Sequence, residues 1–138
     1  MVKMNIRNIV AVVGSLLLVT ACSKDTQSKL YGKWQLQEVE VNGVVEKVDT
    51  VYYNFQQDLF MYQIYRPQTQ SYSYRYGYDI MEGEKTVHIE LINDPGALSS
   101  FLPLTDWSSA KRTFTIDKVS NKQLIMNSEG KNYTFRKF

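Results

Sequence analysis

Tyrosine is the residue whose number and spacing point most directly to chemistry in this chain, because eight of its ten tyrosines lie between residues 52 and 78. A tyrosine ring offers a flat apolar face and a hydroxyl group, which suits a small amphipathic ligand or a sugar ring. Tyrosine also favours strands and fills the interior of a small barrel. The cluster therefore predicts either a ligand-binding wall or a packed interior. The side chains expected to contact a ligand are Tyr62, Tyr74, Tyr76, Tyr78 and Trp107.

A second candidate for function is the segment 93–110, which is apolar but lacks the alternation of a strand. It opens with a turn at residues 93–96, and one helical turn is expected at 97–102. Its apolar side chains are expected to form a lid over an open end of the fold, an exposed patch for a partner, or a plug that seals the core. The plug is the favoured interpretation. The side chains concerned are Leu98, Phe101, Leu102 and Trp107.

Residues able to do catalysis are few and scattered. His88 is the only histidine and Cys22 the only cysteine, so a transition-metal site is not expected. Acid–base catalysis needs two carboxyl groups brought together in a cleft, and nothing in the sequence indicates such a pair. The serine pairs lack the surroundings of a nucleophile elbow. We therefore expect neither an enzyme nor a cofactor. The carboxylates of this region lie mostly at expected turns or in an expected charge pair: Asp79, Glu82, Glu84, Glu90, Asp94 and Asp106.

The strongest strand pattern lies in residues 72–78 and 85–92, where side chains alternate strictly in type. A hairpin tip at residues 82–83 places Tyr78 opposite Val87, and the other tyrosines opposite the apolar face of the second strand. Arg75 then meets Glu90 on the other face, beside an outward-facing His88. This register predicts that the tyrosines of 72–78 point inward.

The other strands are short and are separated by turns. Asn42-Gly43 predicts a type I′ hairpin that pairs Glu38 with Lys47. The next strand is expected to continue to about residue 55, with a bend near residues 49–50. Further strands are expected at about 59–66, 111–119, 122–127 and 131–137. The sequence thus predicts an all-β domain at 31–138, an antiparallel up-and-down barrel of roughly eight strands.

Charge excludes one class of partner. The chain has 16 basic and 14 acidic side chains, but Lys3 and Arg7 lie in an N-terminal segment that we expect to be removed. The remaining part is close to neutral, and no basic stripe suited to phosphate groups is present. A nucleic-acid partner is not expected.

Residues 1–21 have the layout of a secretory signal peptide, with basic residues before an apolar run that is too short to span a bilayer. The run ends in Val19-Thr20-Ala21-Cys22, which resembles the lipobox of bacterial lipoproteins. The resemblance implies a lipid on Cys22 and a tether at 22–30 that anchors the protein to a membrane. Ser23 and the residues after it resemble sorting signals for the bacterial outer membrane, on its periplasmic face or at the cell surface.

Gly32 and Trp34 open the first strand, and Arg136 lies in the last. Together with the strand rhythm, these residues resemble the small lipocalin-like lipoprotein domains of Bacteroidetes over residues 31–138. The resemblance implies that Arg136 covers Trp34 at the closed end, although the register of the last hairpin puts Arg136 on the opposite side. From the aromatic residues we expect a lipid-anchored binding protein that holds a small apolar or aromatic ligand in or at the mouth of the barrel. The alternative is a filled barrel, an accessory or inhibitor lipoprotein that binds another envelope protein through its surface or loops.

Overall fold

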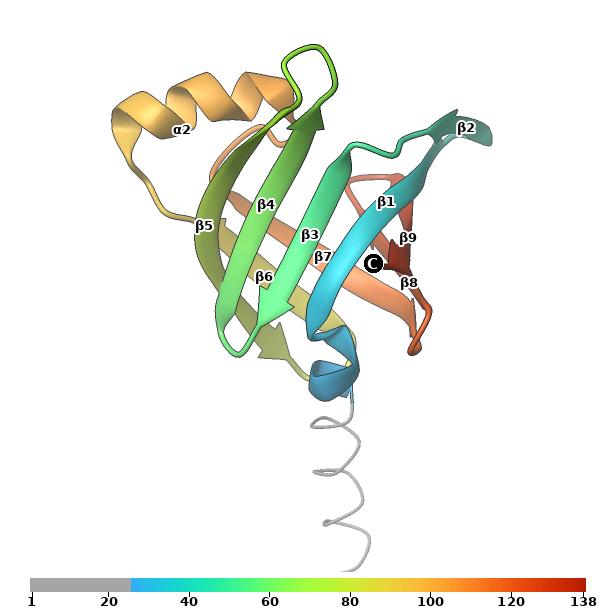
Figure 1. Ribbon diagram of the computed structural model, residues 1–138. Coiled ribbons are helices and arrows are strands. Elements are labelled where there is room, and N and C mark those ends of the chain that lie inside the picture. The colour runs from blue at the N-terminus through green and yellow to red at the C-terminus, as the bar shows by residue number, and fades with distance from the viewer. Residues whose placement is uncertain (1–25) are drawn as a thin grey trace, which may run out of the picture.

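Nine strands make up most of residues 26–138, and each of them ends at a turn or a loop. The computed structural model describes residues 26–138 (Figure 1). The strands are β1 (Gly32–Val41), β2 (Val44–Lys47), β3 (Val51–Gln56), β4 (Leu59–Arg66), β5 (Ser71–Glu82), β6 (Thr86–Leu91), β7 (Lys111–Val119), β8 (Gln123–Ser128) and β9 (Lys131–Lys137). The helical elements are a turn at residues 26–30, α2 (Pro95–Phe101) and the 3₁₀ helix η1 (Leu102–Leu104). Within 26–138, no helix has the length and hydrophobicity to cross a membrane.

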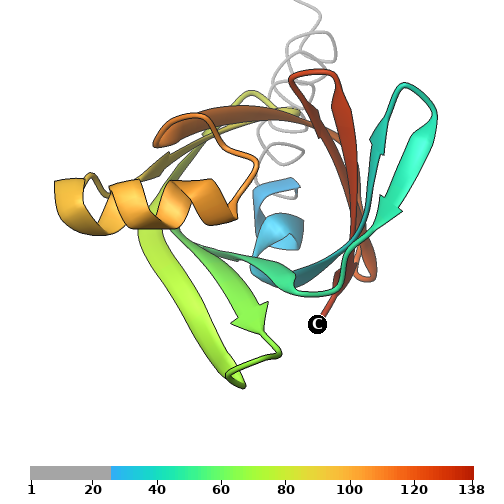
Figure 2. The same cartoon turned by 90° about the horizontal axis from the view of Figure 1, so that it is seen from above.

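The sheet closes because β1 pairs on both of its sides. Its residue Trp34 lies opposite Tyr53 of β3 and opposite Lys137 of β9. Both β2 and β3 also pair with β1, so they act as two halves of one bent strand. The result is the predicted eight-stranded antiparallel up-and-down barrel, which Figure 2 shows end on. Closure pairs the long strands on both sides and, of the described strands, leaves only the four-residue strand β2 with a free edge, which limits edge-to-edge aggregation.

Two hairpins have the predicted register. Asn42 and Gly43 both adopt positive φ, at 51° and 79°, as a type I′ turn requires. Glu38 accordingly lies opposite Lys47. At the other end of the chain, the β8–β9 hairpin pairs its apolar residues on one face: Leu124 with Phe135, and Met126 with Tyr133.

The predicted register of β5 and β6 is wrong by three residues. Tyr78 lies opposite Glu90 rather than Val87. An odd shift turns every side chain of a strand to the other face. The predicted inward tyrosines therefore point out of the barrel and are between 45% and 57% exposed: Tyr72, Tyr74, Tyr76 and Tyr78.

Two inward-facing residues of β5 explain why the register of β5 and β6 differs from the predicted one. Gly77 and Asp79 occupy the inner face of β5 and are buried. A Cβ atom at Gly77 would overlap the backbone carbonyl of Glu90, so glycine is needed for the close approach of β6. The strand then runs on to Glu82, and the turn with Gly83 at φ 66° comes later than predicted.

Arg75 faces inward as a consequence and does not meet Glu90. Its Nη2 atom donates to the carbonyl of Ala97 in α2 at 3.1 Å, and its Nη1 atom donates to the carbonyl of Tyr74 at 2.6 Å. The guanidinium carbon also lies 5.5 Å from the ring centre of Phe101. Arg75 thus fastens α2 to the barrel rather than pairing two strands.

The interior is packed with aromatic rings, centred on Tyr53. Its ring centre lies 4.9 Å from that of Tyr62, 5.0 Å from Phe135 and 5.3 Å from Phe60. These rings belong to β3, β4 and β9, and the Tyr53 ring also meets that of Phe114 on β7, the strand opposite β3, with centres 5.9 Å apart. Such pairs add to the free energy gained by burying the rings themselves. The packed-interior interpretation holds for this part of the lumen, with Tyr53 and Tyr62 rather than the tyrosines of β5.

The end of the barrel near the N-terminus is closed by Trp34. Its indole Nε1 donates to the carbonyl of Leu30 at 2.8 Å, and both side chains are buried. The cation over the indole ring is Lys137, not Arg136 as the resemblance implied, because the register places Lys137 directly opposite Trp34. Arg136 lies outside and donates to Gln35. Since Leu30 is in the core, the packed domain begins before residue 31 and includes the end of the predicted tether.

The opposite end of the barrel is covered in part by α2 and the segment that follows it (Figures 1 and 2). Leu98, Phe101 and Trp107 are buried against the core. The Phe101 ring meets the Tyr62 ring edge to face, with centres 5.4 Å apart. The helix is about where it was predicted, and these side chains act as a partial plug.

Candidate functional site

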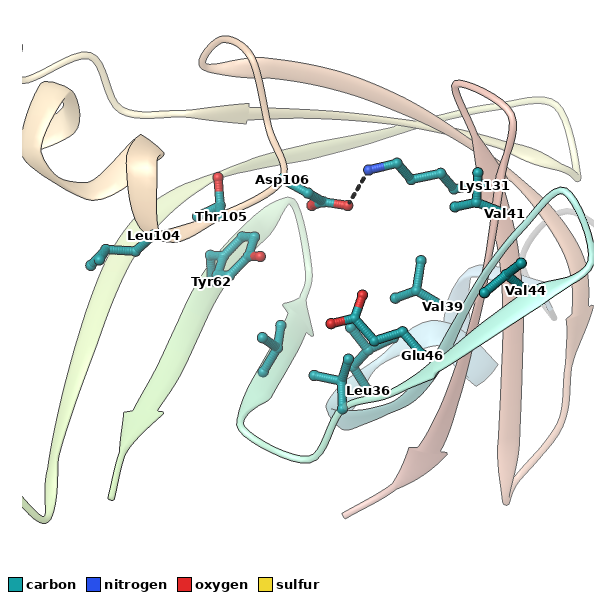
Figure 3. A pocket seen from close by; sticks show the side chains of 12 residues that line it. Leu36, Val39, Val41, Val44, Glu46, Tyr62, Leu104, Thr105, Asp106 and Lys131 are labelled. Atoms are coloured by element: carbon teal, nitrogen blue, oxygen red, sulfur yellow. Dashed lines mark hydrogen bonds and ion pairs between the residues drawn. The ribbon is translucent and has the colours of Figure 1, made fainter. Parts of the chain in front are cut away.

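A pocket of about 360 Å³ remains beside this plug, at the mouth of the barrel (Figure 3). Its walls come from β1, β2, β3 and β4, from the 104–106 segment and from β9. That volume is within the usual range for a small-molecule site. The lining residues are Leu36, Val39, Val41, Val44, Glu46, Val48, Val51, Tyr62, Leu104, Thr105, Asp106 and Lys131.

The lower part of the pocket is apolar. Leu36 and Val39 reach it from β1, and Val51 reaches it from the start of β3. These side chains pack against or belong to the core, so the strands on which they lie are rigid. The ring of Tyr62, which is buried, forms the boundary with the aromatic interior. An apolar body of modest size fits this surface.

The rim of the pocket is charged. Glu46 lies opposite Val39 on the β1–β2 hairpin, and Figure 3 shows its carboxylate beside Val39. The Asp106 carboxylate and the Lys131 ammonium lie on the other side, 3.4 Å apart. The pocket thus combines an apolar floor with a polar rim.

Arg112 is buried behind the rim and organises it. Its Nε atom donates to the Ser128 hydroxyl at 3.1 Å and its Nη2 atom to the Tyr133 hydroxyl at 2.6 Å. Its Nη1 atom lies 3.2 Å from the Asp106 carboxylate, and Nη2 lies 3.4 Å from the Glu129 carboxylate. A buried cation is stable only when it is paired in this way. The network fixes the 104–110 segment against β7 and β9.

The phenols around the network are held neutral. Burial and the hydrogen bond that Tyr133 donates to Asp106 raise the pKa of Tyr133. Burial, followed by the charge of Asp106, raises the pKa of Tyr62. Burial also raises the pKa of Tyr53, whose hydroxyl accepts a hydrogen bond from Trp107 Nε1 at 3.0 Å. These groups offer the site neutral hydroxyls and no phenolate.

The structure brings together only part of the predicted ligand-contacting set. Tyr62 lines the pocket. Trp107 packs against Tyr62 on the core side, and the two ring centres are 5.6 Å apart. Tyr74, Tyr76 and Tyr78 lie on the outer face of β5, away from the lumen. They are therefore not part of this pocket.

Outside the barrel these tyrosines form a surface that we call the tyrosine wall: Tyr65, Tyr72, Tyr74, Tyr76 and Tyr78. Neighbouring rings pack on each other, with centres 5.1 Å apart for Tyr65 and Tyr72. From residue 72 to residue 80 the outer face of β5 carries no charged side chain. Exposed apolar surfaces of this kind often mark an interaction site.

The sequence interpretation missed the centre of the network, Arg112. A signal was present, because the alternation in 111–117 puts Arg112 on the same face as Phe114 and Ile116. The partner Asp106 was considered only as one of several scattered carboxylates. His88, by contrast, faces outward as predicted, where it bonds Thr113 and Glu82 at 2.8 and 2.5 Å.

Nothing in residues 26–138 gathers three metal-ligating side chains. The lipidation residue, Cys22, lies outside the residues that the structure describes. The arrangement at the mouth therefore consists of an apolar pocket, neutral phenols, the ion pair of Asp106 with Lys131 and the carboxylate of Glu46. Those components are suited to holding a small amphipathic molecule.

Comparison with known proteins places this barrel among relatives. The family model of the lipocalin-like domain matches residues 16–138. A lipocalin-like protein from Bacteroides uniformis ATCC 8492 shares 30% identity, with a TM-score of 0.71, over 80% of this chain and 99% of that one. An uncharacterized protein from Bacteroides eggerthii DSM 20697 also shares 30% identity, with a TM-score of 0.64, over 79% and 99%. No curated protein matches.

Proposed function

This chain belongs to the lipocalin-like domain family, and on that premise we propose that it holds a small apolar or aromatic ligand in the pocket at the mouth of its barrel. The observation that carries the proposal is the 360 Å³ pocket with an apolar floor. The rest of the lumen is filled by rings, so a ligand lies at the mouth rather than deep inside. The protein acts by binding and not by catalysis.

The test is the binding of N-phenyl-1-naphthylamine, a neutral apolar fluorophore whose emission rises in dry surroundings. The protein is purified without refolding and titrated with the dye. Val39→Phe fills the pocket, and we expect it to weaken binding about tenfold or more, because a ring occupies the ligand's place. Val45→Phe is the matched control, since Val45 is 48% exposed and lies opposite Glu40 on the outer face of the same hairpin. Equal binding by the native protein and Val39→Phe would argue against this pocket.

We also propose that Cys22 carries a lipid that anchors the protein to the bacterial outer membrane. The motif at residues 19–22 supports this proposal. The helical turn at residues 26–30 lies at the closed end of the barrel, away from α2 (Figure 1), and four positions separate its first residue from Cys22. Four residues span at most about 14 Å. The closed end is therefore held near the bilayer, and the pocket opens away from it.

Cys22→Ser tests the anchor. The variant should lose its lipid and move from the membrane fraction to the soluble fraction, whereas Ser23→Ala should remain bound. Membrane retention of Cys22→Ser would show that the lipobox interpretation is wrong. Protection of the mouth by the bilayer, measured by labelling a cysteine placed at position 131, would contradict the orientation.

A second function, binding of another envelope protein, is favoured by the tyrosine wall. No member of the wall is charged, four of its five tyrosines are between 45% and 57% exposed, and tyrosine is enriched at protein interfaces. Tyr74→Ser with Tyr76→Ser should abolish recovery of a partner that the native protein captures by cross-linking, while Val39→Phe should keep it. The reverse pattern would place the partner at the mouth.

A further inference from the structure

The charged groups at the rim of the pocket differ in whether they are already paired. Glu46 lines the pocket from β2 and has no hydrogen-bond or ion-pair partner among residues 26–138 (Figure 3). The Asp106 carboxylate also faces the pocket, and its side chain is 31% exposed. Two carboxylates therefore face the place where a ligand's polar group would lie.

The cation of the network is not available to a ligand. The side chain of Arg112 is only 1% exposed. Its guanidinium is surrounded by oxygens of Ser128, Tyr133, Asp106 and Glu129, which occupy the donors on all three of its nitrogens. A ligand carboxylate would have to displace one of these buried partners, and that would leave a buried polar group unpaired.

Lys131 is the one basic side chain that lines the pocket. Its ammonium lies 3.4 Å from Asp106 Oδ2, which also accepts a hydrogen bond from the Tyr133 hydroxyl. Lys131 thus balances one of the two carboxylates, and the charge of Glu46 remains. The lining as a whole carries one more negative charge than positive.

From this balance we infer that the ligand carries a positively charged amine on a short apolar body, and that fatty acids and other carboxylates are disfavoured. The inference rests on the proposed function of the same pocket. The apolar body lies on Leu36, Val39 and Val51. The amine lies at the rim within reach of Glu46. A cation close to a carboxylate is favoured by their opposite charges.

The experiment compares three ligands of equal chain length, decylamine, 1-decanol and decanoate, as competitors of N-phenyl-1-naphthylamine below their aggregation limits. We expect decylamine to bind at least about tenfold more tightly than decanoate at low salt, with decanol between them. Glu46→Gln should bring decylamine close to decanol. Glu40→Gln is the control, because Glu40 is exposed on the outer face of the same hairpin.

The outcomes separate the two proposals. Decanoate binding as tightly as decylamine, or no effect of Glu46→Gln on the ratio of the two, would overturn the amine inference while the pocket stands. If neither the dye nor any of the three ligands binds the native protein, the proposed function fails and the inference fails with it. Circular dichroism of each variant verifies that the barrel has folded.

Discussion

The Nζ atom of Lys137 lies 4.4 Å from the ring centre of Trp34, where the first and last strands of the barrel meet. The same ammonium donates to the carbonyl of Tyr31. Burial lowers the pKa of Lys137, so the group gives up hydration to hold this position. The closed end is thus sealed by a cation over an indole, supplied by the residue next to the predicted arginine.

Replacing this cation should weaken the barrel. We expect Lys137→Met to lower the free energy of unfolding by about 1–2 kcal/mol, since it removes a cation–π contact and a hydrogen bond. Arg136→Met, which removes an outer hydrogen bond to Gln35, should cost less. Urea denaturation followed by tryptophan fluorescence measures both. A larger loss of unfolding free energy for Arg136→Met than for Lys137→Met would show that Arg136, and not Lys137, closes this end of the barrel.

Adding a single methyl group at Gly77 should strongly lower the stability of the barrel. Gly77→Ala places a Cβ atom against the Glu90 backbone, which cannot move without breaking the ladder between β5 and β6. We expect a loss of about 2–4 kcal/mol, the scale of a forced overpacking with backbone shift. Gly96→Ala is the control, because nothing lies near that position in α2, and alanine should stabilise the helix slightly. Equal thermal stability of the two variants would contradict the close-approach argument.

The buried network of Arg112 should be costly to break. Arg112→Met removes a hydrogen-bond donor from the Tyr133 and Ser128 hydroxyls and an ion-pair partner from Asp106. Asp106 is 31% exposed and keeps Lys131 and Tyr133 as partners, so we expect a loss of about 1–3 kcal/mol, the scale of leaving a buried polar group without its partner. Lys111→Met, on the exposed face of the same strand, should change stability by less than about 0.5 kcal/mol. A comparable stability of the two variants would mean that the network contributes little.

Asp79 should make stability depend on pH. Its side chain is buried, and burial together with the nearby charge of Asp58 raises its pKa from 3.8 to about 7. Between these pH values the folded protein keeps a proton that the unfolded chain has lost, so stability falls as the pH rises. The loss is complete once the pH exceeds about 7, and it reaches at most about 4 kcal/mol.

Asp79→Asn tests this account, because an amide does not titrate. The variant should lose the decline between pH 4 and pH 7 and should unfold at higher urea concentration than the native protein at pH 8. Asp58→Asn should reduce the decline only in part, since burial is the larger cause. An unchanged pH profile in Asp79→Asn would show that another group is responsible.

The sequence predicts the barrel well where turn chemistry fixes the register. Asn42-Gly43 admits one turn type, and the last hairpin sorts its apolar residues in a single register. The predicted register is wrong at β5, because a tyrosine is stable on either face of a barrel wall and its position does not determine the register. The outward position of Tyr76 is decided by Gly77, whose close contact with β6 is visible only in three dimensions.

The candidate site is harder to predict than the strands. Tyr62 and Trp107 were anticipated from their type, and both lie at the mouth. The network of Arg112 and Asp106 was not, since its members lie on separate elements and meet only when the 104–110 segment folds back on β7 and β9. The alternation of 111–117 is a signal that Arg112 faces inward, but the identity of its partners depends on tertiary packing.

The pairing of β1 with β9 also governs when this protein can fold. Hydrogen bonds at that seam join residues 101 and 106 positions apart in the chain. Contacts between residues so far apart in the sequence slow folding. The entropy of closing the intervening chain is lost before the contacts contribute any favourable free energy. The barrel cannot be completed until its last seven residues are available, and a chain that ends before Lys131 leaves β1 and β8 each with an unpaired edge. Synthesis of β9 therefore determines when the barrel can close. Until β9 is present, the backbone groups of β1 and β8 that it pairs with stay free to pair with another chain.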